Sequence, residues 1–318
     1  MIKKEAPHIA VVTQLVCKHL HSSDFKIERV LSGVSTYVYR IELGEDILYL
    51  RILPEQDMSF AVEVHVHNLL RQRNVQVPEV IYFEHNHEAL GMSVMIVKEI
   101  LGSNIEDHPS IEQYDKILFH AGQQLAVINQ ISVEGYSWIV RSNNQHAIVL
   151  TGEKPLLQDY IYEHLEADLL LLSKNVLLKD VISLIRTILK TGRTLMLRHQ
   201  SHLIHGDFDD SHIFAHQGKF TGIIDFGEIQ GNSPLYDLGH FKLHDGQQGQ
   251  KHRGYPSLTK GYNEVRQLSD DDQIEIDLWA LWIGVRRLGM IYNRTWGSYH
   301  DHLIRAIKLQ MDRLNNKL

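Results

Sequence analysis

The chain has 318 residues and a formal charge of −7 at pH 7. Hydrophobic residues make up 43 % of the sequence and charged residues 22 %, proportions that exclude a disordered or low-complexity protein. The acidic balance argues against a nucleic-acid-binding protein, and the single Cys17 excludes a disulfide framework.

The N-terminus does not resemble a secretion signal. Ile9, Val12, Val16 and Leu20 recur at steps of three and four residues among polar residues, which predicts an amphipathic helix. The longest apolar run that could serve as a membrane span, Leu278–Val285, is far shorter than the roughly 20 residues a span needs. We therefore expect a soluble, cytoplasmic protein that has neither a membrane nor a nucleic acid as its partner.

Residues 26–97 predict an antiparallel sheet with one helix packed on it. Apolar alternation and turn residues indicate strands, and helical spacing follows Ser59, which is a good N-cap. The polar residues His85–Glu88 predict a turn. The expected strands cover 26–31, 37–43, 47–53, 80–83 and 92–97.

The second part of the chain is predicted to be mainly helical. Helical spacing covers 111–128, 156–172, 181–197 and the segment from Ser269 to the end, with short strands between 203 and 225. We therefore expect an α+β protein with an N-lobe at 1–98, a hinge at 99–103 and a C-lobe at 104–318.

One segment carries residues suited to phosphoryl transfer. An apolar strand leads into His205-Gly206-Asp207, His212 follows five residues later, and Asp225 ends the next strand in Asp-Phe-Gly. Phosphoryl transfer needs one carboxylate to accept the proton of the attacking hydroxyl, and further ligands to hold Mg²⁺ on the nucleotide. This pattern predicts Asp207 as the base, and His212 and Asp225 as metal ligands.

These motifs, together with Pro234-Leu235-Tyr236-Asp237-Leu238, resemble those of the aminoglycoside phosphotransferases and their relatives. The resemblance covers roughly 27–102 and 203–241. It implies a bilobal protein-kinase-like fold, with a small antiparallel-sheet N-lobe and a large helical C-lobe. It also implies transfer of the γ-phosphate of ATP or GTP to a hydroxyl of a small molecule, which is an antibiotic such as a macrolide or an aminoglycoside, or a metabolite.

The same resemblance implies a nucleotide site in the N-lobe. Ser32 and Gly33 correspond to the nucleotide-positioning loop, and Arg51 takes the place of the phosphate-binding lysine. Glu63 is expected to pair with Arg51. The backbone at Glu99 and Ile100 is expected to meet the adenine. Asp237 is expected to brace the catalytic loop by hydrogen bonds.

The sequence departs from the family pattern at His212, where most members have Asn and macrolide phosphotransferases have His. Oxygen ligands suit Mg²⁺ better than imidazole. An alternative interpretation is therefore a catalytically inactive nucleotide-binding module of the same fold. A protein kinase ranks last, because no activation loop separates Asp225 from Pro234.

Two further features have simple structural interpretations. Most of the 21 histidines are interpreted as solvated surface residues, with His85 and His87 in a turn. The acidic run Asp270-Asp271-Asp272, with Glu275 and Asp277, could bind a cationic substrate. The favoured interpretation is that these acids stabilise a helix start.

Overall fold

The computed structural model describes residues 4–31, 36–55, 58–106, 110–141, 149–246 and 253–318. The chain divides into two compact units. Unit 1 consists of Met1–Leu101, Val140–Val149 and Thr221–Gly227, and unit 2 consists of Gly102–Ile139, Leu150–Phe220 and Glu228–Leu318. The Asp-Phe-Gly motif therefore belongs to the same unit as the N-terminal sheet, although it lies far away in the sequence.

Unit 1 contains a five-stranded antiparallel sheet with the order β1-β2-β3-β5-β4. The alternation of apolar and polar residues in β2 and β3 predicts two paired strands, and a turn at Gly44 joins them. The strands are β1 (Lys26–Val30), β2 (Tyr37–Leu43), β3 (Asp46–Ile52), β4 (Val80–His87) and β5 (Met92–Lys98).

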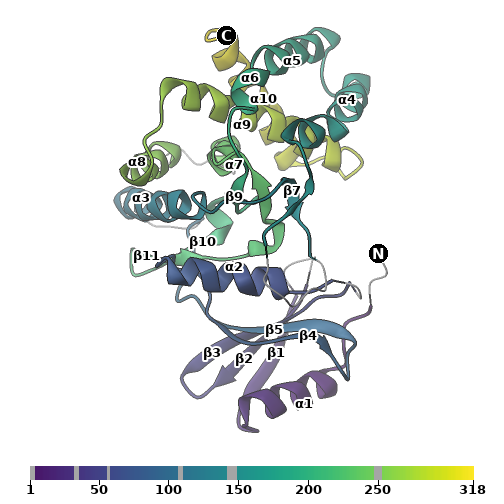
Figure 1. Ribbon diagram of the computed structural model, residues 1–318, viewed down its shortest axis with the longest axis vertical. Coiled ribbons are helices and arrows are strands. Elements are labelled where there is room, and N and C mark those ends of the chain that lie inside the picture. The colour runs from purple at the N-terminus through teal and green to yellow at the C-terminus, as the bar shows by residue number, and fades with distance from the viewer. Residues whose placement is uncertain (1–3, 32–35, 56–57, 107–109, 142–148, 247–252) are drawn as a thin grey trace. The chain divides into compact units, whose positions relative to one another are not determined.

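Helices cover both faces of this sheet. Figure 1 shows α1 (Ile9–Leu20) on one side and α2 (Ala61–Gln72) on the other. Leu48, Leu50 and Ile52 of β3 belong to the hydrophobic cluster that includes α1. The sequence predicted one covering helix. A second is needed because β5 is apolar on both faces and, apart from Lys98, buried throughout.

The edge strand β4 extends further than expected. The predicted turn at His85–Glu88 is wrong, because strand pairing continues to His87. Glu84 pairs with Val94 and His87 with Met92, so β4 holds one residue more than β5 between these pairs. This extra residue is a β-bulge, which a simple polar–apolar pattern does not reveal.

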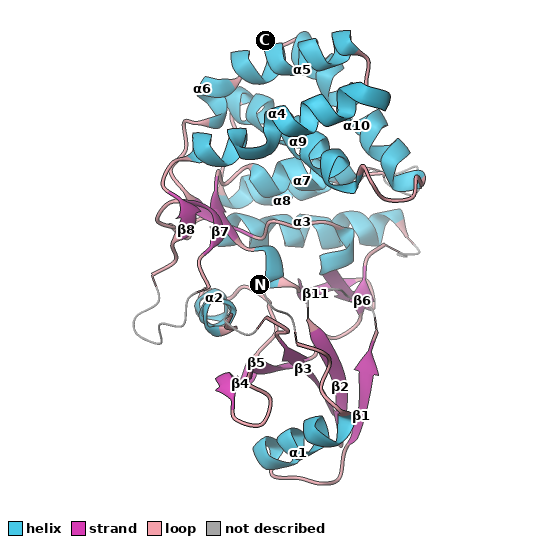
Figure 2. Ribbon diagram, turned by 90° about the vertical axis from the view of Figure 1, so that its right-hand side faces the viewer, coloured by secondary structure: helices cyan, strands magenta, loops and turns pink. Residues whose placement is uncertain are grey.

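Unit 2 is built around the long buried helix α9 (Asp270–Ile291), which packs against α4, α7 and α10 (Figure 2). None of the helices in the described part of the chain is long and apolar enough to cross a bilayer. The other helices are α3 (Ile111–Ile128), α4 (Leu157–Asn175), α5 (Lys179–Thr191), α6 (Arg193–Met196), α7 (Tyr236–His244), α8 (Tyr255–Val265) and α10 (Ser298–Asn315).

Short strands hold the loops of unit 2. One sheet has the order β8-β7-β12-β9, and β10 pairs with β6. These strands are β6 (Ser103–Asn104), β7 (Tyr136–Ile139), β8 (Gly152–Lys154), β9 (His202–Ile204), β10 (Ile213–His216) and β12 (Gln230–Asn232), while β11 (Lys219–Ile223) leads from unit 2 into unit 1.

Candidate functional site

The predicted catalytic loop follows β9 in unit 2. Gly206 has φ +85°, and a Cβ at this position would lie 2.0 Å from the carbonyl oxygen of Glu228. Only glycine fits there, because the backbone is left-handed and the 3₁₀ turn that ends at Glu228 passes close by. The chain then reaches Asp207 and enters a 3₁₀ turn at Asp210–His212 before β10 begins.

Asp237 of α7 fixes this loop through its backbone. The amides of His205 and Gly206 donate to its carboxylate at 2.8 and 2.9 Å, and the Asn129 side chain donates at 3.3 Å. Asp237 is fully buried. The bracing role expected from the sequence is therefore confirmed.

Two cationic or polar side chains contact the Asp207 carboxylate. Arg287 of α9 donates to its Oδ1 at 2.5 Å, and the Nε2 of His240 lies 3.3 Å from the same oxygen. Burial alone would raise the pKa of Asp207, but His240 and the Arg287 guanidinium outweigh it and hold the pKa well below its usual range. The side chain is still 29 % exposed, so this ionised carboxylate can be reached from solvent.

His212 is oriented by the catalytic loop itself. Its Nδ1 lies 2.7 Å from the carbonyl oxygen of Asp207 and 3.4 Å from Oδ1 of Asp209. Because a carbonyl oxygen only accepts, Nδ1 carries the proton, and the lone pair of the neutral ring is on Nε2. This is the tautomer in which Nε2 can act as a metal ligand.

In unit 1, Arg51 forms the predicted ion pair with Glu63. The two side chains are in direct contact, and Nη2 of Arg51 also lies 3.6 Å from Oδ1 of Asp225. Burial alone would lower the pKa of Arg51, but Glu63 and Asp225 raise it above its ordinary value. His67 Nε2 lies 3.9 Å from Glu63, but burial lowers the pKa of His67, so this contact is not an ion pair at neutral pH.

Asp225 has an unusual backbone conformation. Its φ is +62°, a left-handed value that non-glycine residues seldom adopt. Its Oδ1 accepts a hydrogen bond from the amide of Gly227 at 3.3 Å, and the Phe226 ring packs edge-on against His67. Strained residues that the surroundings hold in place are frequent at functional sites.

The other predicted nucleotide residues lie in or near the same unit. The amide of Glu99 donates to the carbonyl of Ile47 at 3.0 Å, its carboxylate accepts from Tyr49, and Ile100 packs close to Gly222. Ser32 and Gly33 lie outside the described residues. The structure therefore brings Arg51, Glu63 and Asp225 together, and it places Asp207 and His212 on one loop.

A pocket next to the catalytic loop was not predicted. It is lined by Gly206, by the aromatic side chains of Trp138, Tyr160 and Trp282, and by Glu228 and Gln230. Trp138 is 37 % exposed, and its indole donates to Glu228 at 3.1 Å. This pocket could not be predicted from the sequence, because side chains of β7, α4, α9 and β12 meet in its walls.

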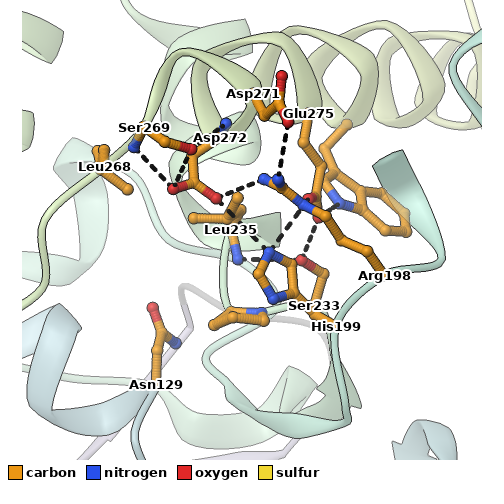
Figure 3. A network of polar contacts seen from close by, with 12 residues as sticks. Asn129, Arg198, His199, Ser233, Leu235, Leu268, Ser269, Asp271, Asp272 and Glu275 are labelled. Carbon is orange, nitrogen blue, oxygen red and sulfur yellow. Dashed lines mark hydrogen bonds and ion pairs between the residues drawn. The ribbon is translucent and has the colours of Figure 1, made fainter. Parts of the chain in front are cut away.

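The acidic run at the start of α9 is structural. Asp272 completes a capping box with Ser269, and Arg198 contacts Asp272 at 2.5 Å and Glu275 at 2.9 Å (Figure 3). Glu275 also accepts from Ser233, and buried Asp277 pairs with Lys242 and Lys317. Helix capping thus explains Asp272, whereas Glu275 and Asp277 are paired inside the protein.

The interpretation of most histidines as surface residues is wrong. Among the described residues, only His8, His21, His120 and His164 are classed as exposed. Seven are buried, and in six of them, all except His87, a ring nitrogen forms a hydrogen bond with the backbone, which makes burial of the imidazole tolerable. These are His67, His87, His205, His240, His244, His300 and His302.

Solved structures define the class of fold. The chain is 17 % identical to a thermostable mutant of aminoglycoside phosphotransferase APH(4)-Ia in its apo form, with a TM-score of 0.64 over 96 % of this chain and 98 % of that one. For the GDP complex of aminoglycoside 2'-phosphotransferase-IIIa the identity is 14 % and the TM-score 0.63, over 96 % and 99 %. The chain therefore has the kinase-like fold of these enzymes.

The sequence decides the family. It matches the Phosphotransferase enzyme family over residues 26–267, and the chain belongs to this family. No curated protein matches it significantly. Family and fold together support a kinase that transfers phosphate from a nucleotide to a hydroxyl of a small molecule.

Proposed function

We propose that this protein transfers the γ-phosphoryl group of ATP or GTP to a hydroxyl of a small molecule, with Asp207 as the base. The observation that carries this proposal is the Asp207 carboxylate, which is ionised, partly exposed and held on a loop braced by Asp237. A positioned carboxylate can orient the attacking hydroxyl and accept its proton as the bond to phosphorus forms.

The nucleotide binds through unit 1 in this proposal. Arg51 is positively charged at all working pH values, and Glu63 holds it in place, so its guanidinium can contact phosphate oxygens. Glu99 and Ile100 supply hinge backbone to the adenine, and Ser32 and Gly33 supply the loop over the phosphates. The assay of ADP or GDP release described below distinguishes ATP from GTP as the phosphate donor.

Asp225 and His212 are the residues that would hold the metal ion. The Asp225 carboxylate is 47 % exposed and offers oxygen ligands, which fit Mg²⁺. The His212 tautomer offers a nitrogen ligand, which suits Mn²⁺ and other transition metals better than Mg²⁺. A bound divalent ion neutralises charge on the phosphates.

The pocket lined by Trp138, Glu228 and Gln230 is the proposed acceptor site, because it adjoins Gly206. Its aromatic walls, the Glu228 carboxylate and the guanidinium groups of Arg286 and Arg287 fit a ring-shaped compound that carries polar hydroxyl groups. The fold is shared with APH(4)-Ia, which has been solved with AMP-PNP and hygromycin B at 17 % identity, a TM-score of 0.62 and 96 % coverage of both chains. Aminoglycosides, macrolides and metabolites with hydroxyl groups are therefore the first acceptors to test.

The test is a coupled assay of ADP or GDP release with this acceptor panel, in Mg²⁺ and in Mn²⁺. We expect acceptor-dependent turnover in the wild type and its loss in Asp207→Asn. One observation favours the inactive-module alternative, namely His at the position where Asn is usual. That alternative would replace our proposal if the wild type bound nucleotide but turned over no acceptor, while His212→Asn became active.

A further inference from the structure

A second group of metal-ligating side chains lies in unit 1, on the sheet face covered by α1. His19 of α1 and Glu84 and His87 of β4 each offer one ligand atom, and these three atoms lie within 4.8 Å of one another. Arg51 and Glu63 lie on the α2 side of the same sheet, because β3 alternates between Leu50 and Arg51. The group is thus separate from the predicted nucleotide residues.

The β-bulge in β4 creates this arrangement. In a regular strand, residues three positions apart point to opposite faces, so Glu84 and His87 would be separated. The extra residue pairs them with Val94 and Met92, which both belong to the hydrophobic cluster under α1. Glu84 and His87 therefore point to the same face, where His19 meets them.

Each of the two histidines has a buried ring nitrogen without a hydrogen-bond partner among the described residues. These atoms are Nε2 of His19 and Nδ1 of His87, and His87 is only 7 % exposed. Leaving a buried polar atom unsatisfied costs about 1–3 kcal/mol. Two such nitrogens beside one carboxylate are the donor set that a bound cation would satisfy.

Neighbouring groups prepare the three side chains for this role. The His19 ring stacks on Tyr82 with centroids 3.8 Å apart, and the Tyr82 hydroxyl donates to Oε2 of Glu84 at 2.5 Å. Such secondary contacts orient metal ligands in known sites.

The two other groups of potential metal ligands in the described part of the chain each have an arginine next to them. Arg198 contacts both Asp272 and Glu275 beside His199, and Arg287 lies 3.2 Å from Nε2 of His240. A guanidinium in that position neutralises the acids and repels a cation. Among the described residues, no lysine or arginine forms an ion pair with Glu84.

We propose that His19, Glu84 and His87 form a site for a divalent transition-metal ion of the Zn²⁺ type. Two imidazoles and one carboxylate are a known ligand set for Zn²⁺, with water in the fourth position. Ligand atoms held tetrahedrally at about 2.1 Å from one ion lie roughly 3.4 Å apart, so small side-chain rotations close the site. The ion links α1 to the edge strand β4 and stabilises unit 1.

The experiment measures zinc binding directly. The protein is treated with EDTA, and ZnCl₂ is then titrated in competition with a chromophoric chelator. We expect one equivalent to bind in the wild type, and to be lost in His19→Ala, Glu84→Gln and His87→Ala. His120→Ala removes an exposed histidine of unit 2 and should keep the equivalent, and so should His212→Ala, which separates this site from the proposed catalytic metal.

Two further readouts keep the test independent of folding defects in the variants. Co²⁺ should give the wild type the visible absorption of a tetrahedral site, and saturating Zn²⁺ should raise its thermal midpoint. A wild type that binds no Zn²⁺ below about 10 μM, or an equivalent that survives His87→Ala, would overturn the proposal. Neither result bears on phosphoryl transfer, because activity is not measured.

Discussion

The proposed catalytic loop and the Arg51 cluster are held in place by different kinds of interaction. The Arg51 cluster consists of Arg51, Glu63 and Asp225. In unit 2, two backbone amides donate to the buried Asp237, so the loop position depends on main-chain hydrogen bonds. In unit 1, Arg51 is held by the side chains of Glu63 and Asp225, and its guanidinium lies over the Phe60 ring. Backbone contacts fix atoms closely, whereas long side chains can exchange partners.

This difference suits the two proposed tasks. A base must stay within hydrogen-bond distance of its proton, so a rigid loop is an advantage. Arg51 must release part of its contact with Asp225 if that carboxylate is to hold a metal ion. Glu63 and Asp225 thus keep Arg51 charged and in place. In the proposed function, phosphate oxygens of the nucleotide then replace one of these two carboxylates. Variants in each region should therefore affect different kinetic constants.

The largest effect is expected for Asp207→Asn. An amide cannot accept the hydroxyl proton, so kcat should fall by roughly 10²- to 10⁴-fold. Nucleotide affinity, measured by calorimetry, should stay at the wild-type value because the Arg51 cluster is intact. A variant that turns over at the wild-type rate would remove Asp207 from the mechanism.

Arg51→Gln should show the opposite pattern. Loss of a charge-assisted contact to phosphate should raise the KM for nucleotide roughly 10- to 100-fold, with a smaller change in kcat. Arg40→Gln, which removes a paired arginine from the neighbouring strand, is the matched control. An unchanged nucleotide KM in Arg51→Gln would contradict the proposed phosphate contact.

Asp237→Asn tests the backbone bracing. Both carboxylate oxygens accept from backbone amides, so either orientation of the new amide places its NH₂ against an N–H donor. The free energy of unfolding should fall by about 1–3 kcal/mol in urea titrations. Asp312→Asn on the exposed face of α10 should change it little. Equal stability of the two variants would mean that the loop does not depend on Asp237.

The smallest effect concerns His244, whose Nδ1 lies 2.9 Å from the carbonyl of His240. Burial lowers the pKa of His244 to about 3. Between that value and the ordinary value near 6.5, the unfolded chain binds a proton that the folded protein does not. His244 therefore lowers the free energy of unfolding as the pH falls below 6.5, and it has no such effect above that pH.

His244→Gln should remove this pH dependence. We compare how much the free energy of unfolding falls between pH 7.5 and pH 5 in each protein. The fall should be smaller in His244→Gln than in the wild type, by roughly 2 kcal/mol at most. Urea unfolding at both pH values measures the difference, with the exposed His120→Gln as control. Parallel losses in wild type and His244→Gln would show that another group carries the acid sensitivity.

Much of the candidate site follows from local sequence patterns. The spacing of Asp207, His212 and Asp225 predicted a catalytic segment, which stays a prediction. The Arg51–Glu63 pair and the bracing by Asp237 were also expected, and the structure contains both. These predictions succeed because each depends on a short motif with one structural meaning. Strand alternation likewise predicted the five strands of an antiparallel sheet, but not the bulge in β4 or the second covering helix.

The features that the sequence could not reveal all join distant segments. Arg287 and His240 reach Asp207 from two helices, and the pocket beside Gly206 draws its walls from four elements. Most histidines were predicted to lie on the surface, whereas seven are buried, because the sequence pattern around a histidine does not reveal its burial. Sequence alone therefore determined the family, the antiparallel sheet and the carboxylate that we propose as the base. Only the tertiary structure decided which groups surround them, since side-chain packing between remote segments sets both burial and charge.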